Sequence, residues 1–237
     1  MSVRGPGAEL GGDFLNAGAL VVCAHDEREG VFRLVAHEQL GVKTFSVQAD
    51  MSAVPDIERL FAQAMEQFGQ IDIVVANTGI ELINVPFVEI TEDQFDRQFG
   101  INTEGTFFTL QAAARHVVDN GRIISIGSST AVVPFAGQAL YGSSKVAPHY
   151  VVGVAAQELA DRGVTVNTIM PTGIEGAGVF TEPNPDDPLR QFIAQPGRIG
   201  RRMGTVDDVA DAAEYLASDL AAWVSGQGLV VTGGALQ

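Results

Sequence analysis

Short apolar runs alternate with longer amphipathic stretches along most of the chain. Most of the short runs are continuous rather than alternating, and they are rich in Val and Ile, which predicts strands buried on both faces of a parallel sheet. The predicted strands cover residues 20–24, 44–48, 71–76, 122–126, 165–169 and 229–232.

The amphipathic stretches predict helices at residues 55–68, 91–118, 140–160 and 206–217. Residues 52–56 open the first of these helices and Thr91 opens the second, so we expect both to supply capping side chains. The regular order of strand, helix and strand predicts one α/β domain over residues 1–237, with a Rossmann-like, doubly wound parallel sheet.

One long irregular stretch, at residues 171–202, is rich in proline. Loops of this length in a compact domain are usually functional, so we expect a substrate loop. Phe180, Phe192 and Ile193 are apolar residues in this otherwise polar stretch, as a lid over a ligand requires. The alternative interpretation is an exposed loop with a few buried anchors.

A formal charge of −15 limits the partners of the protein. Such an acidic surface repels nucleic acid and anionic lipid, so we expect neither as a partner. Cys23 is the only cysteine, which excludes an internal disulfide and argues against a thiolate metal site. No apolar run reaches the roughly 20 residues that span a bilayer, and residues 1–7 contain no stretch of signal-peptide type, so we expect a cytoplasmic protein.

The strongest chemical pattern is Tyr141-Gly-Ser-Ser-Lys145, with Ser128 thirteen residues before Tyr141. Tyr141 and Lys145 are one helical turn apart and share a helix face. Ser128 follows the predicted strand at residues 122–126, at the end where open α/β sheets place their sites. A phenol has a pKa of about 10 and is a poor acid–base group at neutral pH. We expect the Lys145 ammonium to lower the pKa of Tyr141, which then passes a proton to a substrate oxygen held by Ser128.

The spacing of Tyr141 and Lys145 alone is a weak pattern, because most such pairs are surface residues of an amphipathic helix. The serine at its fixed distance and the order of strand followed by helix favour the catalytic interpretation.

Ser128, Tyr141 and Lys145 resemble the catalytic serine, tyrosine and lysine of the short-chain dehydrogenase/reductase family, and the similarity extends from about Gly5 to the end of the chain. The resemblance implies an NAD(P)-dependent oxidoreductase that moves a hydride between the cofactor and a carbonyl or alcohol. Asn102 resembles the helix asparagine that holds a water molecule in the proton relay of the family. The cofactor contacts implied by the resemblance are Asp50, Met51, Asn77, Gly79, Tyr141, Lys145, Pro171 and Ile174.

The glycine motif that opens the first helix of this family is incomplete here, and two alignments of it fit. The first places Arg4-Gly5-Pro6-Gly7 on the last part of T-G-x-x-x-G-x-G, with the preceding strand before Met1. The second starts the motif at Gly7 and keeps a stub of strand at residues 2–4, but it shortens the helix. We prefer the first, which makes Arg4, Gly5 and Gly7 cofactor ligands; a flexible tail is the alternative.

The first strand of the family is central in the sheet order 3-2-1-4-5-6-7, so in this chain a central strand is short or missing. Unpaired neighbours would lose several hydrogen bonds at roughly 1–3 kcal/mol each, so we expect the gap to be closed. We expect residues 1–4 to occupy the place of this strand; the alternatives are that the neighbouring strands slide together or that the working protein has residues upstream of Met1. We also expect a Kd for NADPH poorer than about 100 μM.

Two further positions bear on the cofactor. The family motif P-G-x-I-x-T, which contacts the nicotinamide carboxamide, reads P-T-G-I-E-G at residues 171–176, without the final threonine. His25 stands where NAD-specific members have an acid, and Asp26 follows it. Arg4 is placed to bind the 2′-phosphate of NADP whereas Asp26 repels it, so we expect NADP slightly more than NAD.

The leading hypothesis is a carbonyl reductase or alcohol dehydrogenase for a small-molecule substrate. Residues 102–108 and 121–128 resemble oxoacyl-carrier-protein reductases and hydroxynaphthalene reductases. The alternative is a non-redox or degenerate member of the same scaffold, with weak or no cofactor binding. The resemblance also implies a homotetramer, in which the helices at residues 91–118 and 140–160 pair with their copies.

Overall fold

The computed structural model describes residues 21–25, 44–182 and 184–236. The strands in these ranges are β1 (Val21–His25), β2 (Thr44–Gln48), β3 (Ile71–Ala76), β4 (Val117–Ile126), β5 (Thr165–Pro171) and β6 (Gly228–Val231). The α-helices are α3 (Val54–Phe68), α4 (Glu92–Phe99), α5 (Thr106–His116), α6 (Ala139–Glu158), α7 (Pro188–Ile193) and α8 (Val206–Ala217).

Every described strand pair is parallel, as predicted. β3, β4, β5 and β6 form one sheet in that order, and β1 and β2 form a separate pair. Among the described residues no strand joins β1 to β3. The predicted position of the short or missing first strand is between these two strands. Residues 1–4, which we expected at this position, lie outside the described residues.

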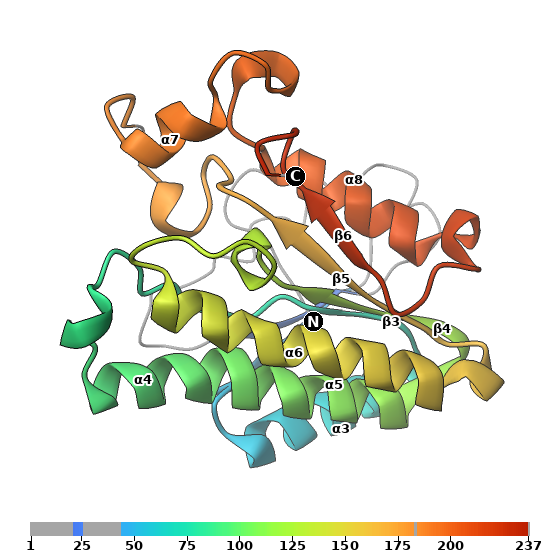
Figure 1. Cartoon of the computed structure of the whole chain (residues 1–237). Helices are drawn as coiled ribbons and strands as arrows, with labels where there is room; N and C mark the ends of the chain where they lie inside the picture. The colour runs from blue at the N-terminus through green and yellow to red at the C-terminus, as the bar shows by residue number, and fades with distance from the viewer. Residues whose placement is uncertain (1–20, 26–43, 183, 237) are drawn as a thin grey trace.

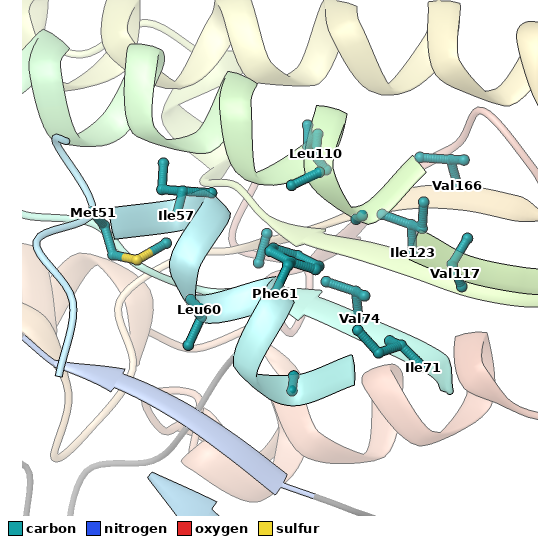
Figure 2. Close-up of a cluster of buried hydrophobic side chains, with 14 of the residues drawn as sticks. Met51, Ile57, Leu60, Phe61, Ile71, Val74, Leu110, Val117, Ile123 and Val166 are labelled. Carbon is teal, nitrogen blue, oxygen red and sulfur yellow. The ribbon is translucent and has the colours of Figure 1, made fainter. Parts of the chain in front are cut away.

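Helices cover both faces of the four-stranded sheet, as a doubly wound fold requires (Figure 1). On one face α3, α5 and α6 pack over a cluster in which Leu60 and Phe61 meet Val74, and each of these is fully buried (Figure 2). On the other face α8 contributes Leu216 to a cluster with Ile124 of β4. Burying one such side chain contributes about 1.5–3 kcal/mol, so both helix layers hold the sheet in place.

The start of α3 differs from the predicted capping. Its N-cap residue is Ala53, whose side chain makes no capping hydrogen bond. Ser52 donates from its backbone N–H and its hydroxyl to Asp50 Oδ1. The Asp56 carboxylate reaches back to accept the Asp50 N–H at 2.8 Å. Asp56 therefore ties the helix to the end of β2, but no side chain caps the N-terminus of α3, so the capping expected from residues 52–56 is wrong.

The helix predicted at residues 91–118 consists of three parts. Thr91 caps α4 as predicted, in a reciprocal pair with Gln94: their side chains accept each other's backbone N–H at 3.3 and 3.0 Å. A π-helical turn, Gly100–Gly105, then leads into α5, which ends at His116 because β4 begins at the next residue. Gly105 allows close packing here, since a Cβ at this position would lie 2.1 Å from the carbonyl oxygen of Met51.

The stretch at residues 171–202 has more structure than predicted, because it contains α7 and two short 3-10 turns. Phe180 and Ile193 are buried in a small cluster with Met203 and Ala235, whereas Phe192 is 40% exposed. We call this small cluster the loop core. Two of the three apolar residues expected to face a ligand are thus anchors of the loop itself.

Candidate active site

Ser128, Tyr141 and Lys145 lie together at the carboxyl end of β4, where the sequence places them. β4 ends at Ile126, just before Ser128, and Tyr141 and Lys145 occupy successive turns of α6. Lys145 Nζ lies 3.4 Å from the carbonyl oxygen of Ile126 and 5.9 Å from the centre of the Tyr141 ring. Each of the three side chains is at most 7% exposed, so their polar groups act in an environment largely shielded from water.

The Ser128 hydroxyl is oriented by its neighbour. It accepts hydrogen bonds from the backbone N–H of Thr130 at 3.2 Å and from the Thr130 hydroxyl at 2.9 Å. A hydroxyl has one proton to donate, and both of these bonds use its acceptor side. Hydrogen bonding to Ser128 lowers the pKa of Tyr141, in keeping with a Ser128 proton directed at the phenol oxygen.

The protonation of Tyr141 differs from the sequence-based expectation. Burial raises the pKa of the phenol above its usual 10, and the negative charge of Glu81 raises it further. Burial also lowers the pKa of Lys145, to about 8, so its ammonium is only weakly favoured at neutral pH. The charge of Lys145 does not offset the effect of burial on the pKa of Tyr141. The expected lowering of the Tyr141 pKa by Lys145 is therefore wrong for these residues alone, and Tyr141 is held as a protonated phenol.

Asn102 is completely buried within the π-helical turn and uses its side-chain amide to hold other parts of the site. Its Oδ1 accepts the backbone N–H of Ile80 at 2.8 Å, and its Nδ2 donates to the carbonyl oxygen of Ile80 at 2.9 Å and to Ser144 Oγ at 3.0 Å. Both N–H donors of the amide are thereby used. A water molecule held by Asn102, as the family resemblance implies, would have to be held by other atoms of this residue.

The turn after β3 brings the residue pair Asn77 and Gly79 to the same edge. Both residues are exposed, and Gly79 lies directly against the catalytic side chains. A Cβ at Gly79 would be 2.7 Å from Lys145 Nζ and 3.2 Å from Asn102 Oδ1. A side chain at this position would therefore have to displace the Lys145 ammonium, which the sequence pattern did not indicate.

The remaining cofactor candidates in the described ranges follow β2 and β5. Met51 is 5% exposed, with its side chain in the core, so only its backbone is placed to meet a ligand. Asp50 Oδ1 accepts from the backbone N–H and the hydroxyl of Ser52, at 2.9 and 2.6 Å, so this carboxylate holds the turn after β2. Pro171 ends β5, and Ile174 is 8% exposed.

Gly176 occupies the position of the lost threonine in the family motif. Its φ of +79° is in the region that favours glycine, so the backbone turns at this position in a way that a threonine would strain. Arg4 and Asp26, on which the choice between NADP and NAD depended, lie outside the described residues, as do the predicted cofactor ligands Gly5 and Gly7.

Three residues of the site were missed by sequence reasoning. Gln98, fully buried, donates to the carbonyl oxygen of Ile80 at 2.9 Å and accepts the N–H of Leu82 at 3.0 Å. Ser144 joins Asn102 to the carbonyl oxygen of Tyr141, to which it donates at 2.7 Å. The third is Glu81, whose charge acts on Tyr141. Gln98 lies one helical turn before Asn102, and a buried amide at that spacing was the one available signal.

No group of His, Cys, Asp or Glu side chains suited to hold a metal ion occurs within the described ranges. The helices described also include none that is both long and apolar enough to cross a membrane.

Comparison with known proteins decides the family. A family model described as enoyl-(acyl carrier protein) reductase matches residues 2–235. A short-chain dehydrogenase/reductase of Pestalotiopsis microspora is 35% identical, over 98% of this chain and 92% of that protein. The chain belongs to the short-chain dehydrogenase/reductase family.

Other members of the family give the same picture. The hydroxynaphthalene reductase-like protein Arp2 of Metarhizium majus is 32% identical, over 98% of this chain and 91% of that protein. A short-chain dehydrogenase from Burkholderia cenocepacia, solved in complex with NADP, superposes with a TM-score of 0.83 at 29% identity, covering 95% of this chain and 91% of that one. The family is one of NAD(P)-dependent oxidoreductases, so the predicted fold and general activity are confirmed.

Proposed function

We propose that this short-chain dehydrogenase/reductase is an NADP(H)-dependent ketoreductase, which interconverts a small carbonyl compound and its secondary alcohol. The observation that carries the proposal is the burial of Ser128, Tyr141 and Lys145 side by side at the carboxyl end of β4. The relative solved with NADP and the hydroxynaphthalene reductase-like relatives support the choice of cofactor and of reaction.

The donor groups present fit a nicotinamide nucleotide. Lys145 offers three N–H donors, and its hydrogen bond to the carbonyl oxygen of Ile126 is long, at 3.4 Å, which suits it to the hydroxyls of a ribose. Gly79 has no side chain, so its backbone can lie close to this ammonium. When bound, the cofactor would supply the hydride. We propose Asn77, Gly79, Tyr141 and Lys145 as its contacts, together with Asp50, Met51, Pro171 and Ile174.

The protein's own contribution in the reductive direction is a proton. Tyr141 is held protonated by burial and by Glu81, which is the form that can donate to the oxygen of a carbonyl. The single donor proton of Ser128, directed at the phenol oxygen in this structure, would turn to hold the substrate oxygen when substrate binds. Asn102 keeps α6 and the turn after β3 in register through Ser144 and Ile80.

The reaction is tested with NADPH that carries deuterium at C4 of the nicotinamide and a panel of aromatic and aliphatic ketones. We expect the alcohol product to carry one deuterium on the carbinol carbon, detected by mass spectrometry. Binding of NADPH without any labelled alcohol from the panel would argue for the degenerate alternative.

We also propose a homotetramer. α4, α5 and α6 lie side by side on one face (Figure 1), and apolar side chains on it are exposed: Phe107 is 41%, Val146 47% and Tyr150 75% exposed. Light scattering at micromolar concentration should give about four times the monomer mass of 25.0 kDa, and the monomer mass would contradict the proposal.

The proposed setting is the cytoplasm, where the lone Cys23 would stay reduced.

A further inference from the structure

Glu81 connects the catalytic edge to the substrate loop. Its side chain is exposed, two residues beyond Gly79, and its Oε2 accepts the backbone N–H of Val179 at 2.9 Å. Gly178 permits this contact: its φ is +56°, and a Cβ there would lie 2.2 Å from Glu81 Oε2. The two partners are 98 residues apart in the sequence, so the bond joins separate parts of the fold.

The backbone of Glu81 is held firmly on both sides. The buried amides of Gln98 and Asn102 bind the preceding residue, Ile80, and Gln98 also binds the following residue, Leu82. Since both amides are fully buried, they fix the backbone from which the Glu81 side chain extends. The Glu81 carboxylate therefore extends from a backbone that the side chains of Gln98 and Asn102 hold in place.

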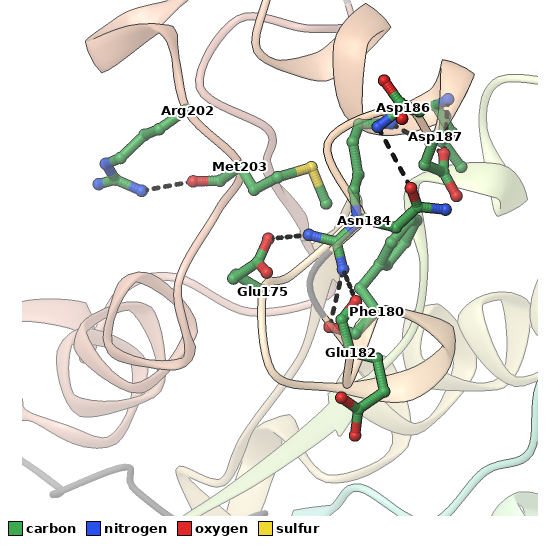
Figure 3. Close-up of polar contacts among 10 residues, drawn as sticks. Glu175, Phe180, Glu182, Asn184, Asp186, Asp187, Arg202 and Met203 are labelled. Atoms are coloured by element: carbon green, nitrogen blue, oxygen red, sulfur yellow. Dashed lines mark hydrogen bonds and ion pairs between the residues drawn. The ribbon is translucent and has the colours of Figure 1, made fainter.

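The loop on the other side of the contact is equally well held. Arg190 is 8% exposed and donates to the carbonyl oxygens of Phe180 and Glu182 at 3.1 and 2.7 Å, and it pairs with Glu175 (Figure 3). Its guanidinium also lies 5.2 Å from the centre of the Phe180 ring. Val179 directly precedes Phe180, so the N–H that Glu81 accepts belongs to a turn anchored in the loop core.

Glu81 also faces the reacting group. Its charge and its hydrogen bonding raise the pKa of Tyr141, and its charge raises the pKa of Lys145. A single carboxylate thus contacts the loop while it lies beside the acid–base pair.

We propose that Glu81 is a positioning residue that docks the substrate loop, through Val179, onto the catalytic edge beside Tyr141. The proposal rests on the proposed ketoreductase function, in which the loop encloses the substrate. Loss of the contact should weaken the binding of substrate, whereas the binding of NADPH should stay unchanged.

The kinetic test compares Glu81→Ala, Glu81→Gln and a matched control, Glu182→Gln. Glu182 carries the same charge and lies on the loop that Glu81 contacts, but it meets Arg190 through its backbone carbonyl. We expect Glu81→Ala to raise KM for the ketone about tenfold or more, as for a lost hydrogen bond to a charged group. Glu81→Gln retains an acceptor oxygen for Val179 and should keep KM within about threefold of the wild type, as should the control.

The pH profile separates this role from a merely structural one. Reduction requires the protonated phenol, so the rate falls as pH rises through the apparent pKa of Tyr141. Because the charge of Glu81 raises that pKa, Glu81→Ala and Glu81→Gln should both move the alkaline limb to lower pH, and Glu182→Gln should not. An unmoved limb in both Glu81 variants would overturn the placement of Glu81 beside Tyr141.

Hydrogen exchange tests the docking without turnover. The Val179 amide should exchange faster in Glu81→Ala than in the wild type, and at the wild-type rate in Glu81→Gln. Gly178→Ala, which displaces the carboxylate from the loop side, should behave like Glu81→Ala. Unchanged exchange at Val179 in Glu81→Ala would refute the docking contact, even if the wild type showed no ketone reduction at all.

Discussion

Replacing Tyr141 with Phe should reduce ketone turnover by at least about 100-fold, because the substitution deletes the one proton that the site donates. The ring and its burial are retained, and the removed hydroxyl is the group whose pKa burial and Glu81 keep high. We expect the melting temperature and the Kd for NADPH to stay close to those of the wild type. The measurement is the rate of deuterated alcohol formation from labelled NADPH.

Tyr150→Phe is the matched control for this variant. Tyr150 lies on the same helix, but it is 75% exposed and away from the catalytic residues, so its hydroxyl should be dispensable. If Tyr141→Phe retained more than about a tenth of the wild-type rate, Tyr141 would not be the acid–base group.

Replacing Lys145 with Met should also abolish turnover, but it should make the fold more stable. The Lys145 side chain is buried with one long hydrogen bond, and burial lowers its pKa from 10.5 to about 8. A shift of this size corresponds to a cost on the order of 3 kcal/mol for holding the ammonium inside the protein at neutral pH. Met has a similar length and carries no charge, so at pH 7 the variant should melt about 6–12 °C above the wild type.

The pH dependence gives this prediction its sign. Below pH 8 the lysine is charged in both the folded and the unfolded protein, and the folded state bears the full cost of the buried charge. Between about pH 8 and 10.5 the folded protein releases its proton first, so the unfolded state binds more protons and the free energy of unfolding rises with pH. The advantage of the Met variant should therefore shrink over this range. A variant that is less stable than the wild type, by the same amount at every pH, would contradict the account.

The catalytic residues could be predicted from the sequence because their spacing carries geometry. Tyr141 and Lys145 are four positions apart, which places both on one face of any helix, and Ser128 follows a strongly apolar strand. Both predictions depend only on local structure, and the observed helix α6 and strand β4 agree with them. The parallel order of β3, β4, β5 and β6 followed in the same way from the alternation of strand and helix.

The residues that the sequence missed are those that depend on long-range contacts. Glu81 and Val179 meet across 98 positions, and Gln98 binds Ile80 and Leu82 across 18 and 16. No local pattern reports such pairs. The pKa of Tyr141 was misjudged for a related reason, since it depends on burial and on Glu81, and neither can be read from the spacing of Tyr141 and Lys145.

The helix predicted at residues 91–118 shows a limit of a different kind. Apolar periodicity continues through the π-helical turn at Gly100–Gly105, because such a turn shifts the face of a helix without breaking it. Its end was placed two residues late, since the Val residues that start β4 also extend the apolar pattern of α5. Periodicity therefore located the helix but neither its internal irregularity nor its boundary.

The central claim is that Lys145 and the turn at Gly79 form a binding site for NADPH at this edge of the sheet. Isothermal titration calorimetry of the wild type and of Lys145→Met tests it directly, with NADPH up to about 1 mM. This concentration half-saturates a site whose binding free energy is about −4.1 kcal/mol. We expect saturable binding of NADPH to the wild type, tighter than that of NADH, and binding at least about tenfold weaker in the Met variant. Equal binding by the two proteins, or none by the wild type, would contradict the account.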